Sequence, residues 1–167
     1  YTEFRTLSPD TSTNNQEFGY RTVARNDGRT LVVSAPGKGQ GEVNFLFRSS
    51  HNAGTAFVTQ STATMTDNDD NTSRLGESLT ISTDENFVVA GAPYTNTIGA
   101  DGSTRQQNAG LLKIFIWEPS TFKYSLLDTI TPPTDGSTAN ENLNFGWDHK
   151  ISEPGTSSVR TTPDKYL

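Results

Sequence analysis

The chain of 167 residues contains no cysteine, so it can form neither disulfide bonds nor metal sites built on thiolates. It also lacks any apolar stretch approaching the roughly 20 residues that a membrane-spanning helix needs, and no signal-peptide pattern opens it. We therefore expect no membrane insertion in this segment. The absence of cysteine does not decide the compartment, because large repeat folds outside the cell need no disulfides.

Basic residues are few, with 13 Lys and Arg against 19 Asp and Glu and a net charge of −6. No basic patch interleaves with aromatic residues, so nucleic acid is not an expected partner. Hydrophobic residues make up only 31% of the chain, a composition that by itself is compatible with disorder. They are concentrated in strand-length runs, however, together with nine Phe, five Tyr and two Trp. We expect a thin β core that carries long polar loops.

A motif recurs along the chain. A large apolar residue precedes Gly19, and Ala35-Pro36 follows 16 positions later; Gly76 and Ala92-Pro93 repeat this spacing. A third copy opens at Phe145-Gly146 and stops before its Ala-Pro. Self-similarity with a period of tens of residues indicates a repeat architecture.

The content of each repeat favours β structure. The three glycines lie 57 and 70 residues apart, a length that suits a four-stranded β unit better than a helical hairpin. Leu79 and Ile81 alternate with polar residues, which is the pattern of a half-buried strand. The apolar runs elsewhere predict strands over 31–33, 42–47 and 55–59 in the first unit, and over 87–89, 111–117 and 122–127 in the second.

These residues resemble the FG-GAP repeat, the blade unit of integrin-α-type β-propellers, in a short-hairpin variant like the bacterial ones. The resemblance rests on Phe18-Gly19, Phe145-Gly146 and Gly91-Ala92-Pro93, while Ser34 and Leu75 depart from the family pattern. It implies an all-β fold, a β-propeller segment of four-stranded antiparallel blades arranged around a central channel. Propellers contain about four to eight blades, so two blades would leave open edges.

The repeat boundaries divide the chain into four parts. Residues 1–17 are expected to form the last strand and linker of a preceding blade. Residues 18–74 form one blade, and residues 75–144 form a second blade with a long loop over 94–109. Residues 145–167 begin a following blade. We therefore expect the chain to be a piece of a longer polypeptide.

Calcium is the first candidate ligand, because integrin-type blades often carry an acidic loop whose oxygens converge on Ca²⁺. The equivalent hairpins here, 25–29 and 83–86, are too short and hold too few carboxylates. The other candidate metal site comprises Asp67, Asp69 and Asp70. Two interpretations stay open for it, a calcium loop and a solvated loop between blades, and the second is favoured because exposed acidic clusters are usually surface. No other cofactor is expected.

The long loop over 94–109 is the largest difference between the two complete units. Asp101, Ser103, Arg105 and Gln106 give it polar side chains that could bind a ligand. Loops held by a rigid scaffold often carry function. A tolerated surface insertion is the alternative, since loop length costs little entropy.

Catalysis is not expected. His51 and His149 are the only histidines, and no metal-binding or nucleophile motif surrounds them. Trp117, Trp147 and Tyr124 could stack on sugars. Packing in the core between blades is the alternative for these rings.

The sequence thus predicts a non-catalytic module for adhesion, recognition and scaffolding, located extracellularly on a cell surface or a virion. Its partner would be a protein or glycan ligand. A second hypothesis is a structural repeat that joins copies of itself edge to edge in a filament, appendage or phage or virus fibre. A third is a non-catalytic module attached to a hydrolase. An adhesin segment should be monomeric, an assembly element should self-associate, and the third class should show a catalytic motif in the flanking sequence.

Overall fold

The computed structural model describes residues 16–52, 55–65, 73–98, 102, 104–132 and 142–151. Over these residues the chain forms ten β-strands and no helix. The described part accordingly contains no apolar helix of the length that crosses a membrane. The prediction of an all-β fold is confirmed.

The first sheet is an antiparallel meander in the order β1-β2-β3-β4. Its strands are β1 (Thr22–Ala24), β2 (Thr30–Ala35), β3 (Glu42–Phe47) and β4 (Val58–Thr64). Sequential strands joined by hairpins are the usual result of short polar turns between apolar runs. The unit therefore contains the four strands that its length predicted.

The position of β4 differs from the prediction, which placed this strand over 55–59. β4 pairs with β3 from Phe47–Val58 to Glu42–Thr64, so it starts three residues later and extends five residues further. The strand consists mostly of Thr, Ser and Gln and lies at the edge of the sheet. Its place is set by backbone pairing with β3 rather than by an apolar pattern of its own, and this is why the apolar pattern misplaced it.

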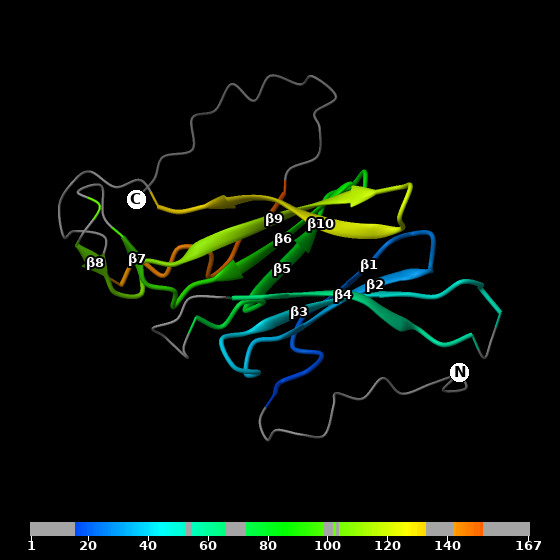
Figure 1. Cartoon of the computed structure of the whole chain (residues 1–167), viewed down its shortest axis with the longest axis horizontal. Helices are drawn as coiled ribbons and strands as arrows, with labels where there is room; N and C mark the ends of the chain where they lie inside the picture. Colours follow the sequence, from blue (N-terminus) through cyan, green and yellow to red (C-terminus); the bar gives the residue numbers. More distant parts are fainter. Residues whose placement is uncertain are drawn as a thin grey trace.

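The second sheet repeats the meander in the order β5-β6-β9-β10. Its strands are β5 (Ser78–Ile81), β6 (Phe87–Ala92), β9 (Leu111–Glu118) and β10 (Lys123–Ile130). The long loop between β6 and β9 contains a small separate hairpin of β7 (Thr97–Ile98) and β8 (Arg105–Gln106). In Figure 1 this hairpin lies to one side of the second sheet.

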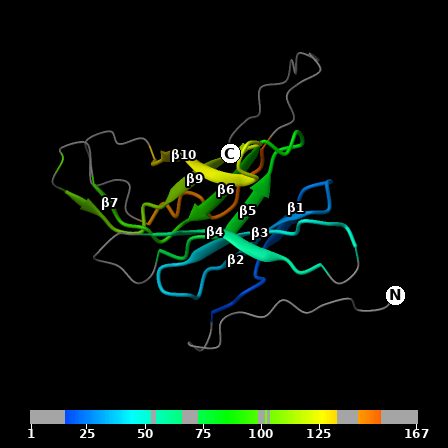
Figure 2. The ribbon, with the colours of Figure 1, turned by 45° about the vertical axis from the view of Figure 1, so that its right-hand side comes forward.

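The two sheets pack face to face and enclose the core. Figures 1 and 2 show them as two layers, with β1 beside β5 and β4 beside β10. Both sheets contribute buried side chains to one cluster: Val32, Val43 and Phe45 from the first, and Leu79, Val88, Ala90, Ala92, Leu111, Phe115 and Tyr124 from the second. Burial of a large apolar side chain contributes about 1.5–3 kcal/mol, so this interface is the main source of stability.

The junction between the units requires glycine at two equivalent positions outside the recurring motif, Gly41 and Gly110. Gly41 forms a parallel bridge with Leu75, and its φ of 99° is one that residues with a Cβ rarely adopt. A Cβ on Gly41 would lie 2.0 Å from the backbone nitrogen of Leu75. The same contact recurs where Gly110 bridges Phe145 in parallel. Glycine is therefore required where the start of one repeat crosses the preceding repeat.

Residues 142–151 begin the third copy of the motif. They lie against β5 and β6 on the face of the second sheet that is turned away from the first sheet (Figure 1). Within the described part of this segment Phe145 makes an isolated bridge and no strand forms, while residues 152–167, the rest of the part expected to begin a following blade, lie outside the described residues. The described residues form two stacked sheets and no closed propeller, and the part expected from a preceding blade, 1–10, lies outside them.

Candidate functional site

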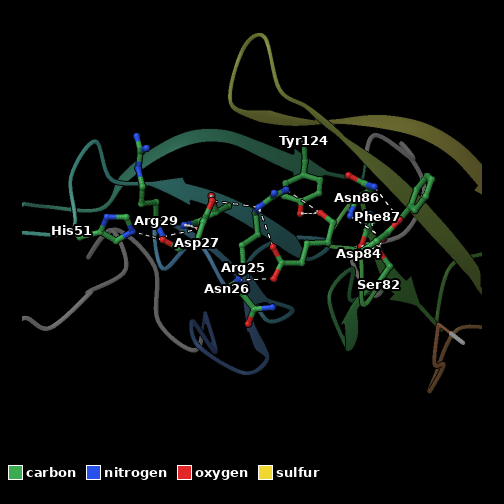
Figure 3. Close-up of polar contacts among 12 residues, drawn as sticks. Arg25, Asn26, Asp27, Arg29, His51, Ser82, Asp84, Asn86, Phe87 and Tyr124 are labelled. Atoms are coloured by element: carbon green, nitrogen blue, oxygen red, sulfur yellow. Dashed lines mark hydrogen bonds and ion pairs between the residues drawn. The ribbon is translucent and has the colours of Figure 1, made fainter. Parts of the chain in front are cut away.

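A cluster of polar contacts joins the β1–β2 hairpin to the β5–β6 hairpin (Figure 3). The Nε atom of Arg25 lies 3.3 Å from a carboxylate oxygen of Asp27 and 3.6 Å from one of Glu85. Arg25 Nη1 also donates to the backbone oxygen of Glu85 at 3.0 Å, and the backbone nitrogen of Asn26 donates to the Glu85 carboxylate at 2.6 Å. The two sheets are thereby joined at the hairpin end.

Aromatic rings complete this cluster. The guanidinium of Arg25 lies 4.2 Å from the centre of the Trp117 ring, close enough for a cation–π interaction. Tyr124 packs against Trp117, and its hydroxyl donates to the backbone oxygen of Glu85 at 2.7 Å. Burial raises the pKa of the Tyr124 hydroxyl, so it remains a neutral donor at physiological pH. The arrangement is that of a structural clasp between repeats.

The aspartates of both hairpins, unlike Glu85, accept hydrogen bonds within their own turns. Asp27 accepts from the backbone nitrogens of Arg29 and Thr30 at 2.8 and 3.1 Å. Asp84 accepts from Ser82 Oγ at 2.5 Å and from the backbone nitrogen of Asn86 at 3.1 Å, and these bonds lower its pKa. Both aspartates thus stabilise tight turns. Among the described residues no group of three or more acidic or histidine side chains is placed to hold a metal ion.

The residues proposed from the sequence as binding groups are only partly described by the structure. Asp67, Asp69 and Asp70 lie outside the described residues, as do Asp101 and Ser103. The other two proposed ligand-binding residues lie on β8 and differ in exposure: Arg105 is exposed and Gln106 is fully buried. Thr97 Oγ1 lies 3.4 Å from Gln106 Oε1. Gln106 is therefore part of the interior of the β7–β8 hairpin, and Arg105 is the side chain that a partner could reach.

The base of the long loop holds the third copy of the motif. Asn108 receives a hydrogen bond on its backbone oxygen from Asn144 at 3.0 Å, and its side chain donates to Asn142 at 3.0 Å. The backbone nitrogen of Phe145 donates to Ala109 at 2.9 Å. A role in positioning residues 142–145 is thus a concrete function of this loop, one that its sequence did not predict.

A Ser–His pair that the sequence did not reveal lies under the third copy. Ser78 Oγ is 2.9 Å from His149 Nδ1, and His149 Nε2 is 3.0 Å from the backbone oxygen of Val89. Ser78 is 4% exposed and donates its hydroxyl hydrogen to Gly146 at 2.6 Å. These contacts attach the third copy to β5 and β6 of the second sheet. One feature of the sequence could have drawn attention to His149: it follows Gly146 by three residues, as Leu79 follows Gly76 in the second unit.

His149 makes the attachment of residues 142–151 sensitive to pH. Burial lowers its pKa below the ordinary 6.5, while the contact with Val89 and the nearby Asp148 act in the opposite direction. The attached state therefore binds a proton less readily than the detached state, and attachment weakens as the pH falls below about 6.5. The slope should not exceed about 1.4 kcal/mol per pH unit, the limit for one proton.

Hydrogen–deuterium exchange of the amides of 142–151, corrected for intrinsic rates, measures this dependence. We expect faster exchange at pH 5 than at pH 7 and no such change in His149→Leu, which places the residue of the second repeat in the third. His51→Gln, at an exposed histidine, is the control and should behave as wild type. Equal pH dependence in His149→Leu would exclude this histidine as the cause.

The aromatic residues considered for sugar binding differ in exposure. Tyr124 is 3% exposed, and Trp117 is half-buried in the inter-sheet cluster, so both belong to packing. Trp147 is 52% exposed and its ring lies 5.5 Å from that of Tyr94. Trp147 is thus the one of the three whose ring surface is open to a partner.

A groove lies between the edge strands of the two sheets and was not predicted. It has a volume of about 270 Å³ and is lined by β3, β4, β9 and β10. Its walls combine aromatic rings with hydroxyl groups and the half-buried cation of Lys113. The residues are scattered in sequence, and only the stacking of the sheets brings them together.

No protein-family model matches the chain, and no curated protein matches it in sequence.

Proposed function

We propose that this chain is a segment of a β-propeller-type repeat scaffold of the FG-GAP kind, whose units stack in series within a longer polypeptide. The observation that carries the proposal is the recurrence of one junction. Gly41 bridges Leu75 between the first and second units, and Gly110 bridges Phe145 between the second unit and the third copy. A contact that repeats at equivalent positions is suited to adding further units.

The outer face of the second sheet supports the same proposal. Gly76 faces Ser34 and Val43 of the first sheet, and Gly146 faces Gly91 and Leu112 of the second at the equivalent positions. The first sheet packs on the second through side chains of β2 and β3. The side chains of β6 and β9 on the outer face of the second sheet occupy the equivalent positions in the second unit. The corresponding pairs are Val89 with Val32, Leu112 with Val43, Ile114 with Phe45, and Ile116 with Phe47. Val89 is already buried, and a third sheet would bury Leu112, Ile114 and Ile116, which are half-buried.

The role of such a scaffold would be recognition or adhesion without a catalytic step, at a cell or particle surface. Polar loop residues such as Arg105 and exposed aromatic residues such as Trp147 would contact a protein or glycan. The burial of Ser78 and the occupation of Asp27 and Asp84 by their own turns support a structural use of these side chains.

The intact mass of the native polypeptide, with peptide mapping across both ends, tests the proposal. We expect a mass that corresponds to about four to eight repeat units, the size of a propeller. A mass near 18.2 kDa, that of this chain alone, would contradict a single-chain propeller. In that case light scattering would show whether copies cover the outer face of the second sheet by self-association.

A further inference from the structure

The groove between β4 and β10 has an apolar floor. Phe45 and Phe115 meet edge to face with 5.1 Å between ring centres, and Tyr124 stacks on Phe45 at 5.4 Å. Leu126, 53% exposed, stands at the rim. The volume of about 270 Å³ is just below the range of about 300–1,000 Å³ typical of drug-sized ligands. The groove therefore suits a ligand with a single ring.

One cation lies in this apolar setting. Lys113 occupies an inward-facing position on β9, paired with Ala90 of β6. Its Nζ donates to the backbone oxygen of Thr64 at 3.0 Å, and no carboxylate of the described residues lies within ion-pairing distance of it. Burial lowers the pKa of this amine. An ammonium group has three donors, so two remain for a ligand.

A second polar group lies in the same groove without a partner. The hydroxyl oxygen of Ser61 is buried and makes no hydrogen bond. Ser61 pairs with Phe45 across the β3–β4 ladder, which places it on the inner face of the first sheet. Leaving a buried hydroxyl unsatisfied costs about 1–3 kcal/mol. The oxygen is covered in its present position, so the Ser61 side chain must turn about its Cα–Cβ bond toward the groove. A ligand that then accepts from Ser61 and from Lys113 would remove this cost.

We propose that the groove between β4 and β10 binds a small carboxylate with a flat apolar body. The carboxylate accepts from Lys113 and Ser61, and the ring lies against Phe115 and Leu126. A neutral ligand would leave the ammonium without a counter-charge, and a phosphate would lose much of its hydration among these rings. The inference adds a ligand class to the recognition role proposed above, and it depends on the stacking of the two sheets but not on the number of repeats.

Titration of the 167-residue chain with benzoate at low ionic strength, followed by NMR, tests the proposal. We expect saturable binding, with benzyl alcohol and benzylamine, the neutral and cationic analogues, binding at least tenfold more weakly. Lys113→Met should weaken benzoate binding at least tenfold. Lys123→Met, at an exposed lysine of β10, is the matched control and should bind as wild type.

Two further variants keep the result interpretable. Leu126→Asp changes an exposed rim residue and places a negative charge beside the groove, so it should also weaken benzoate binding while the thermal unfolding midpoint stays near that of wild type. Ser61→Ala should weaken binding severalfold. Equal binding of benzylamine, unchanged binding in Lys113→Met or the lack of saturable binding by about 10 mM benzoate would each overturn the proposal. None of these results depends on the intact mass, so the two proposals fail separately.

Discussion

Replacing Gly41 by alanine should lower the free energy of unfolding by roughly 3 kcal/mol or more, the range of severe single substitutions. Two costs combine in this variant. A residue with a Cβ is strained at the φ of 99° that Gly41 adopts. The new Cβ would also lie 2.0 Å from the nitrogen and 2.5 Å from the oxygen of Leu75, which are backbone atoms at the start of the second unit. Relief therefore requires the sheets to move apart at this end.

Gly19→Ala separates the two costs. Gly19 has a φ of 87°, but a Cβ at this position would meet no atom within 4 Å. This variant should lose only the backbone term, about 1–2 kcal/mol. Urea denaturation followed by circular dichroism measures both variants under the same conditions. Equal losses in the two would mean that the junction at Leu75 tolerates a side chain, and the steric reason for glycine at position 41 would then be wrong.

The same substitution at the second junction tests whether the contact is general. A Cβ on Gly110 would lie 2.1 Å from the backbone oxygen of Phe145. Because Phe145 belongs to the short segment 142–151, Gly110→Ala should release this segment while most of the two sheets stays folded. Faster amide exchange confined to the segment is the expected result, and exchange at the wild-type rate would contradict it.

Much of the architecture could be predicted from the sequence because its information is local. The equal spacing from Gly19 to Ala35-Pro36 and from Gly76 to Ala92-Pro93 marks two related units, and the apolar runs in each mark the central strands. Strands β2, β3, β6 and β9 are rich in Val, Leu, Ile and Phe and were located well. Edge strand β4 was misplaced because its Thr and Ser residues carry little apolar pattern.

The candidate sites could not be predicted because they depend on which face of one sheet meets which face of the other. Lys113 and Ser61 are 52 positions apart and enter one groove only through this stacking. Arg25 and Glu85 are neighbours for the same reason. Glu85 also adopts a φ of 58°, in the left-handed region of backbone conformation. Residues other than glycine are uncommon in this region, and Glu85 adopts this conformation at the position where it contacts Arg25.

Arg25→Ala should lower the free energy of unfolding by about 2–3 kcal/mol, because removing one partner of a partly buried ion pair leaves the other without a counter-charge. The side chains of Arg25 and Glu85 are 16% and 14% exposed, so water replaces the lost contacts poorly. The variant also loses the bond from Nη1 to the backbone oxygen of Glu85 and the cation over Trp117. Trp117 fluorescence should change together with the unfolding midpoint.

A matched arginine in the same hairpin provides the control. Arg29 also lies over an aromatic ring, with 4.6 Å to the centre of Phe47, and its Nε donates to the backbone oxygen of Arg48. Both of these partners belong to the first unit, and the contact of Arg29 with the second unit is the ring of Phe122 at 5.9 Å, at the outer limit for a cation–π interaction. Arg29→Ala removes the same charge and a similar ring contact without removing the Glu85 contacts. We expect it to cost less than half as much as Arg25→Ala.

A double-mutant cycle with Glu85→Gln decides whether the clasp acts between the sheets. Arg25→Ala and Glu85→Gln should show a coupling energy of about 1 kcal/mol or more, whereas Arg29→Ala and Glu85→Gln should be additive. Additivity in both pairs would show that Arg25 stabilises its own hairpin alone. Strands β2 and β5 run from one end of the stacked sheets to the other, with the bridge of Gly41 and Leu75 at one end and the Arg25 clasp at the opposite end. Coupling would therefore mean that backbone contact fixes one end of the junction and side-chain charge fixes the other. The two sheets, which share one apolar core, would then keep a single relative orientation.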